Sequence, residues 1–168
     1  MNPISEAVIT GKDKKPKISQ YYKERGRKDR LESSIAGLRD FHNRFVKTQL
    51  ITGFLQDDGI DKHLLDLSCG QGGDIPRWFE ASGETTKNKY ESILGIDIVK
   101  ENIYNVNGGA LDRLMNHTHR NKGKKLPSVS FVWGNSSNNL MDGSIAANET
   151  EKNKLFAYFT KNIPGGIP

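Results

Sequence analysis

A glycine-rich turn between an apolar segment and a helix-like segment constrains this chain most. Residues 64–74 read Leu-Leu-Asp-Leu-Ser-Cys-Gly-Gln-Gly-Gly-Asp, an apolar run that passes directly into glycines. Gly70, Gly72 and Gly73 allow a tight turn and let a ligand approach the backbone, because they carry no Cβ. Asp74 can cap the helix that follows. This order of strand, turn and helix predicts an α/β protein that binds a nucleotide-like cofactor at the turn.

A second acid supports the same site. Residues 92–98 read Ser-Ile-Leu-Gly-Ile-Asp-Ile and predict a second strand that ends near Asp97. Asp97 lies 97 − 73 = 24 residues after the last glycine. This is close to the spacing of about 20 residues at which such an acid binds ribose hydroxyls.

The spacing of the glycines separates two classes of cofactor. The pattern is Gly-x-Gly-Gly, whereas a dinucleotide fingerprint needs a third glycine five residues after the first, where this chain has Ile75, followed by Pro76. A nucleotide-binding oxidoreductase domain is therefore a disfavoured alternative. A cofactor with a ribose and an adenine but no phosphate leaves Asp66, at the end of the first strand, free to attract a positive group. S-adenosylmethionine is such a molecule.

Two motifs carry a specific resemblance to a known family. Residues 65–78, Leu-Asp-Leu-Ser-Cys-Gly-Gln-Gly-Gly-Asp-Ile-Pro-Arg-Trp, resemble the first motif of mRNA cap guanine-N7 methyltransferases. Residues 38–51 resemble the helix that these enzymes place just before it, and their Phe-His-Asn is nearest to the capping enzymes of large DNA viruses. The similarity continues through residues 95–103, 109–113 and 131–136.

The resemblance implies a Rossmann-like class I S-adenosylmethionine-dependent methyltransferase, of which we expect only the N-terminal half, with strands one to three and an N-terminal helix. The implied reaction is methyl transfer to N7 of the guanine cap of mRNA. N7 is already nucleophilic and a sulfonium methyl is already electrophilic, so alignment is the main task and no general base is needed. No catalytic residue is therefore assigned.

The family motif assigns the parts of the S-adenosyl-L-methionine site to residues at the first two strands. Asp66 favours the sulfonium by its charge. Gly70 and Gly72 line the methionine portion, and Asp97 accepts from both ribose hydroxyls.

Four further residues complete the implied site. Lys47 pairs with the methionine carboxylate, while Asn135 and Ser136 lie at the edge of the adenine. The family more often has Asp at the position of Asn135, so an acceptor is kept and a charge is lost. Asn43 is the expected substrate-binding residue. A solvated stripe on the helix remains an alternative reading of Asn43 and Lys47.

Three regions are expected in the chain of 168 residues. Residues 1–32 form a basic arm, residues 33–140 the donor-binding portion, and residues 141–168 a truncated or divergent segment without a recognisable fourth strand. Because the acceptor pocket of this family comes largely from beyond strand three, we expect the chain alone to be inactive.

The positive charge is concentrated, although the net charge is only +5. One cluster comprises Lys12, Lys14, Lys15, Lys17, Lys23, Arg25, Arg27, Lys28 and Arg30, and another comprises Arg120, Lys122, Lys124 and Lys125. Both can contact phosphates, although such runs are often only solvated. The expected partner is the capped 5′ end of mRNA, with other domains or subunits of a capping enzyme as further candidates. A non-catalytic RNA-binding remnant or a subunit of a capping complex stays open as an alternative.

Further expectations follow from composition. No apolar run reaches the ~18 residues of a membrane span, so we expect no membrane partner and an intracellular protein. The location would be the cytoplasm, a viral factory or the virion for a viral protein, and the nucleus for a cellular one. Cys69 is the only cysteine, which excludes an internal disulfide and a cysteine cluster for zinc, and no metal site is expected.

Helical periodicity predicts further elements. A helix from Ser33 or Ser34 to Gly53 should pack through Leu38, Phe41 and Phe45. Other helices are expected over residues 74–81, over 103–114 with a weak point at the glycine pair 108–109, and over 154–163. Residues 128–133 predict a third strand.

Overall fold

The computed structural model describes residues 35–53, 55, 60, 62–81 and 89–163. The basic arm and the two serines expected to cap the first helix lie outside these residues. Contacts divide the chain into two compact units after Arg39, and the second unit, from Asp40 onward, contains the sheet and the site residues described below.

Three parallel strands form the described sheet, which confirms the α/β class. They are β1 (Lys62–Asp66), β2 (Tyr90–Asp97) and β3 (Ser128–Trp133), in the order β1-β2-β3. Asp66 pairs with Gly95, and Asp97 pairs with Trp133. Because parallel strands end at the same edge of a sheet, this register brings the expected cofactor residues together.

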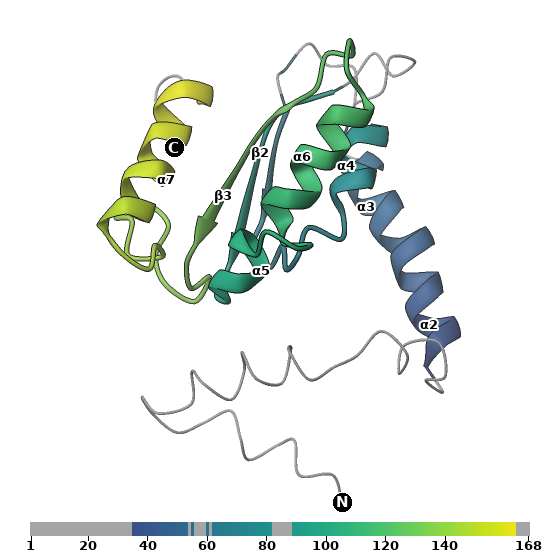
Figure 1. Ribbon diagram of the computed structural model, residues 1–168, viewed down its shortest axis with the longest axis horizontal. Coiled ribbons are helices and arrows are strands. Elements are labelled where there is room, and N and C mark those ends of the chain that lie inside the picture. The colour runs from purple at the N-terminus through teal and green to yellow at the C-terminus, as the bar shows by residue number, and fades with distance from the viewer. Residues whose placement is uncertain (1–34, 54, 56–59, 61, 82–88, 164–168) are drawn as a thin grey trace, which may run out of the picture. The chain divides into compact units, whose positions relative to one another are not determined.

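One face of the sheet is covered by α4 (Ile75–Ala81) and α6 (Ala110–Arg120), with the short α5 (Lys100–Tyr104) near the ends of the strands (Figure 1). The buried residues of this core are Cys69, Ile75, Trp78, Phe79, Tyr90, Ile93, Ile103, Ala110 and Phe131. The order of strand, turn and helix is therefore the predicted one.

The opposite face of β2 and β3 is covered by α7 (Glu149–Asn162), drawn in yellow in Figure 1. Its core comprises Leu94, Ile96, Val132, Ile145, Leu155 and Tyr158. The side-chain oxygen of Asn148 accepts from the N–H of Glu151, so α7 begins earlier and is longer than the predicted helix over residues 154–163. No fourth strand is formed in the described part of residues 141–163.

The helix that precedes the sheet contains a π-helical turn. It runs as α2 (Ala36–Phe41), η2 (His42–Val46) and α3 (Lys47–Gly53), and the N–H of Lys47 bonds to the carbonyl of His42. The predicted end at Gly53 is confirmed. The predicted packing face is wrong in this structure, since Leu38, Phe41 and Phe45 are 68%, 55% and 56% exposed.

The single helix predicted over residues 103–114 is also wrong. Instead α5 ends at Tyr104, and the turn between it and α6 contains Gly108, whose φ of +97° lies in the left-handed region. The break lets α6 restart at Ala110, which is fully buried. α6 extends to Arg120, beyond the predicted end at residue 114.

Candidate S-adenosylmethionine-binding site

The glycine turn after β1 is a tight loop that only glycine fits well. Gly70 and Gly72 have φ angles of +54° and +70°. A methyl group at Gly72 would lie 2.5 Å from Cδ1 of Ile75 and 3.1 Å from Cα of Ala110. The turn is closed by the N–H of Gly72, which donates to the carbonyl of Cys69 at 2.9 Å. Both predicted glycines are therefore required by the backbone, whatever they bind.

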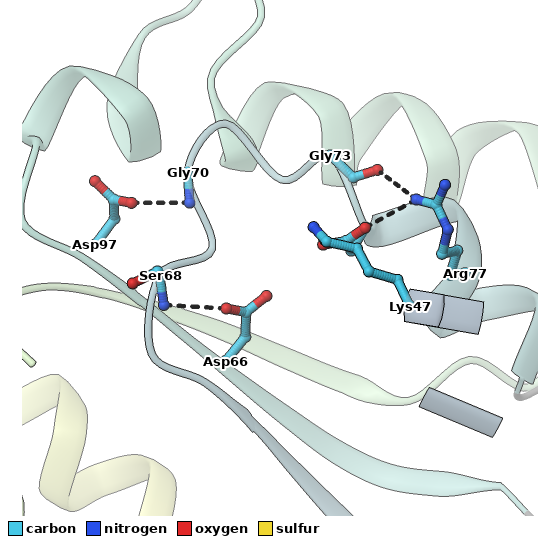
Figure 2. A network of polar contacts seen from close by, with 8 residues as sticks. Lys47, Asp66, Ser68, Gly70, Gly73, Arg77 and Asp97 are labelled. Carbon is cyan, nitrogen blue, oxygen red and sulfur yellow. Dashed lines mark hydrogen bonds and ion pairs between the residues drawn. The ribbon is translucent and has the colours of Figure 1, made fainter. Parts of the chain in front are cut away.

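Asp97 joins the turn to the end of β2. Its Oδ2 accepts from the N–H of Gly70 at 2.8 Å (Figure 2), and its Oδ1 accepts from the N–H of Val99 at 2.8 Å. The side-chain amide of Asn102 is the third donor to this carboxylate and donates to Oδ1 at 3.1 Å. The carboxylate is thus oriented before any ligand arrives, and it is only 8% exposed.

Asp66, at the end of β1, is the second acid of the site. Its Oδ1 accepts from the N–H of Ser68 at 3.1 Å. Burial raises the pKa of Asp66 above its ordinary value, and the negative charges of Asp74 and Asp97 act in the same direction, against the Ser68 N–H and Lys47. A cation bound near Asp66 would favour its ionised form and lower that pKa again.

Lys47, at the start of α3, contacts an acid of the turn. Its Nζ lies 2.6 Å from Oδ2 of Asp74, and Arg77 contacts Oδ1 of the same carboxylate at 2.8 Å. The Asp74 carboxylate therefore does not cap α4 as expected: among the described residues, its oxygens contact these two cations. Figure 2 shows Lys47 and Arg77 at one end of the turn and Asp97 at the other. The Lys47 side chain remains 35% exposed and can reach a ligand.

The remaining predicted residues lie on two other segments. Asn135 lies two residues after the end of β3 and is partly exposed, and its Oδ1 accepts from the N–H of Ser137 at 3.1 Å. Ser136 is exposed beside it. Asn43 is partly buried in the π-helical turn, one turn before Lys47. The structure therefore brings Lys47, Asp66, both glycines and Asp97 to one turn, while Asn43, Asn135 and Ser136 come from flanking segments.

Three residues of this network were missed in the sequence. Asp74 was predicted as a cap rather than a partner of Lys47, and Arg77 and Asn102 were given no role. A polar residue five positions after Asp97 is a weak signal for Asn102. No local pattern indicates the pairing of Lys47 with Asp74, which are 27 residues apart.

Two other features bear on the chemistry of the site. Cys69 is buried inside the turn, and this burial raises the pKa of its thiol strongly, so that it behaves as a packing residue. No group of three or more metal-binding side chains occurs within the described ranges. No helix in that part of the chain is long and apolar enough to span a membrane.

Comparisons with known proteins agree with this arrangement. Residues 8–160 match the mRNA (guanine-N(7))-methyltransferase domain family. An mRNA cap guanine-N(7) methyltransferase of Aspergillus niger is 46% identical over 67 residues, covering 36% of this chain and 11% of that protein. One of Drosophila melanogaster is 39% identical over 66 residues, covering 36% of this chain and 15% of that protein.

A viral relative extends the comparison. A probable mRNA-capping enzyme of Acanthamoeba polyphaga mimivirus is 33% identical over 84 residues, covering 50% of this chain and 6% of that protein. The match therefore spans only a small part of the length of these relatives. With the family match covering most of the chain, and the glycine turn and its acids in place, this protein belongs to the mRNA (guanine-N(7))-methyltransferase domain family.

Proposed function

We propose that this chain binds S-adenosyl-L-methionine and forms the donor-binding half of an enzyme that methylates N7 of the guanine cap of mRNA. The observation that carries the proposal is the hydrogen bond from the Gly70 N–H to Asp97. It joins the turn that approaches a ligand and the acid that accepts ribose hydroxyls into one preorganised unit.

The charges of the site suit the donor. Asp66 lies near the turn, and its pKa is raised chiefly by burial, with the charges of Asp74 and Asp97 acting in the same direction, so a bound cation would stabilise its ionised form. A sulfonium supplies such a positive charge. The tight turn at Gly70 and Gly72 offers backbone that a methionine chain can approach closely.

Lys47 is suited to bind the methionine carboxylate. An ammonium has three N–H donors, of which one is directed to Asp74, so that others remain for a ligand. Arg77 holds the other oxygen of Asp74 and so fixes the acid that positions Lys47. We therefore assign Lys47 to the carboxylate, with Asp74 and Arg77 as positioning residues.

The flanking residues complete the proposed site. Among the described residues, the side chain of Asn135 bonds only through its oxygen, to the Ser137 N–H, so its amide N–H groups can face the adenine. The exposed Ser136 lies next to it. Asn43, on the same helix as Lys47, is assigned to the guanine acceptor side.

The donor supplies a methyl group that is electrophilic when it arrives, so the residues of this chain have to bind, orient and exclude water. Transfer to N7 needs no proton removal, which agrees with a site whose acids are held by N–H groups and cations rather than aimed at a substrate proton. An oxidoreductase domain stays disfavoured, because Ile75, the first residue of α4, stands where a dinucleotide fingerprint has its third glycine.

The proposed substrate is the capped 5′ end of mRNA, inside the cell or in a viral compartment. Four exposed cations at the end of α6 and in the next loop, Arg120, Lys122, Lys124 and Lys125, are available to RNA phosphates. Other domains or subunits of a capping enzyme are proposed to supply the rest of the acceptor pocket, since the matched relatives are much longer.

Calorimetric titration tests the donor site. S-adenosylhomocysteine should bind the chain and raise its melting temperature by mass action, whereas NAD should do neither. Asp97→Ala should remove most of that thermal shift, while Asp112→Ala, which removes an acid of α6, should keep it. An unchanged shift in Asp97→Ala would remove Asp97 from the ribose role. Binding of a cap analogue without donor binding would favour the RNA-binding remnant.

Transfer of labelled methyl to a GpppN-capped RNA tests the activity. We expect none from the 168-residue chain alone, and transfer once the other domains or subunits of a capping enzyme are supplied. Robust turnover by the chain alone would show that the acceptor pocket is formed within it.

A further inference from the structure

β3 lies at an edge of the described sheet, away from the glycine turn. The strand order β1-β2-β3 leaves β3 with β2 as its one neighbour among the described strands (Figure 1). Just after β3, the N–H of Gly134 donates to the carbonyl of Asp97 in β2. Because the backbone groups of successive strand residues point to opposite sides, those of Val129, Phe131 and Trp133 point away from β2.

The chain itself pairs the last of these three residues. The N–H of Trp133 donates to Oε2 of Glu151 at 3.0 Å, and its carbonyl accepts from the N–H of Ala147 at 3.0 Å. Ala146 forms an isolated antiparallel bridge with Gly134. The segment before α7 therefore covers the end of β3 as a further strand would, and then turns into the helix.

A groove runs along the part of the edge that stays open. Within the described ranges, no residue pairs with the outward backbone groups of Val129 and Phe131. Both residues line this groove, which we call the β3 groove and which has a volume of about 420 Å³. An extended chain fills roughly 160 Å³ per residue, from a rise of about 3.3 Å, a strand spacing of about 4.8 Å and a sheet spacing of about 10 Å. The β3 groove therefore has room for about three residues of an additional strand.

The two walls of the β3 groove differ in chemistry. On one side α6 contributes Leu111, which is 41% exposed. On the other side α7 contributes Lys154, Ala157 and Lys161, whose spacing of three and four residues places them on one face of that helix. Both lysines are exposed. Tyr104 of α5 closes one end, where its hydroxyl accepts from the Nζ of Lys154 at 2.9 Å. One wall is thus apolar and the other is basic.

We propose that the β3 groove binds an extended acidic peptide, which adds to the open edge of the sheet as a further strand. The backbone of the peptide pairs with Val129 and Phe131. Successive side chains of a strand point to opposite faces, so aliphatic side chains contact Leu111 while alternate carboxylates contact Lys154 and Lys161. The partner is therefore a segment in which acidic and aliphatic residues alternate. This docking surface goes beyond the proposed function and does not depend on donor binding.

The charge and the backbone of the groove disfavour two other occupants. Residues 1–32 of this chain carry the larger basic cluster, which Lys154 and Lys161 would repel. A single-stranded RNA would suit the two lysines, but it has no row of N–H and carbonyl groups to pair with a strand edge.

Nuclear magnetic resonance on the 168-residue chain tests this surface with synthetic peptides. The probe is a blocked peptide with the sequence Val-Glu-Val-Glu-Val-Glu. At saturation it should slow the amide hydrogen exchange of Val129 and Phe131 at least about tenfold. The exchange of Trp133 should stay unchanged, because its N–H already donates to Glu151. The isomer Val-Val-Val-Glu-Glu-Glu, and the alternating peptide with methylated backbone nitrogens, should each bind at least about tenfold more weakly.

Charge reversal on α7 supplies a matched pair of variants. Lys161→Glu should weaken binding of the alternating peptide about tenfold. Lys152→Glu makes the same change on the opposite face of α7, where the Nζ of Lys152 lies over the Phe156 ring, and should leave that affinity unchanged. Equal weakening by both replacements would refute a specific contact with the basic wall.

Three further results would overturn the proposal. The first is no binding of the alternating peptide, and the second is binding that leaves amide exchange at Val129 and Phe131 unchanged. The third is protection of these amides by oligouridylate but not by the peptide, which would assign the β3 groove to RNA. None of these results bears on S-adenosylhomocysteine binding, so the donor site is tested separately.

Discussion

Replacement of Glu151 by alanine should destabilise the fold strongly. Glu151 lies in the first turn of α7, is 5% exposed, and is bonded by groups from three different elements. Its Oε2 accepts from the N–H of Trp133 at 3.0 Å, Tyr104 donates at 2.8 Å, and the Nζ of Lys154 lies 2.8 Å from Oε1. This carboxylate therefore ties α7 to β3 and α5.

The expected cost follows from these contacts. Breaking one partner of a buried charge pair costs about 3–5 kcal/mol, because the groups left behind lose their compensation. Lys154 is 45% exposed and can turn to water, which favours the lower end, about 3 kcal/mol. In a chain of this size that loss lowers the melting temperature by roughly 6–12 °C.

Urea unfolding followed by circular dichroism measures this difference, with Glu149→Ala as the matched control. Glu149 lies in the same helical turn but is exposed, so its replacement should change stability by only about 0.5 kcal/mol. A Glu151→Ala variant within that margin of the wild type would refute the view that this carboxylate anchors α7.

The pH dependence gives a second readout of Glu151. Burial raises its pKa, but the bonds from Lys154, Trp133 and Tyr104 outweigh burial and hold the pKa below its ordinary value. The folded state therefore binds the proton less readily than the unfolded chain. The stabilisation by Glu151 is complete above the unfolded pKa and is lost as the pH falls through the folded value. The difference between the wild type and Glu151→Ala should shrink correspondingly in acid.

Three other replacements test the turn and its charges. Lys47→Met should weaken S-adenosylhomocysteine binding in calorimetry by roughly 1.5–3 kcal/mol, with little loss of fold. The control, Lys161→Met on α7, should leave this affinity unchanged. If Lys47→Met binds as tightly as the wild type, Lys47 is only a surface lysine. Gly72→Ala should lower the free energy of unfolding in urea by about 2 kcal/mol or more, because Gly72 has a positive φ and the new methyl group would contact α4. Gly73→Ala, whose new methyl group meets no atom within 4 Å, should be nearly neutral. Similar costs for both variants would contradict this packing. Asp66→Asn should raise the melting temperature at neutral pH and weaken donor binding. Because the pKa of Asp66 is raised in the folded state, the gain in stability should fade as the pH drops toward 3.8. A gain that persists in acid would contradict the burial of the Asp66 charge.

The parts of the fold that the sequence predicts well are those with strong local signals. Residues 128–133 form a strand with the predicted bounds, and the glycines at 70 and 72 adopt the positive φ that the motif implies. Local patterns do not give the sign of a backbone angle, so the pair at 108–109 was read as a weak point inside one helix. In the structure α5 ends at Tyr104, and Gly108 lies with a positive φ in the turn before α6.

The missed features of the site depend on contacts between distant segments. The partner of Asp74 comes from α3, and the buried Glu151 finds its partners on β3 and α5. Helical spacing identified the stripe of Phe41 and Phe45 correctly as one face, since their rings stack at 5.4 Å. Spacing alone does not say what covers a face, and these rings are exposed.

The π-helical turn at His42–Val46 has a consequence for comparing this chain with its relatives. Such a turn accommodates one residue more than a regular α-helix does, without disturbing the helix on either side. Deletion of one residue there should restore a continuous α-helix and rotate Phe41, the last residue of α2, by about 100° around the helix axis relative to Lys47. An alignment of this segment with relatives should therefore place its gap inside residues 42–46. Lys47 then keeps its position relative to the glycine turn, while Phe41, on the N-terminal side of the gap, moves to another face of the helix.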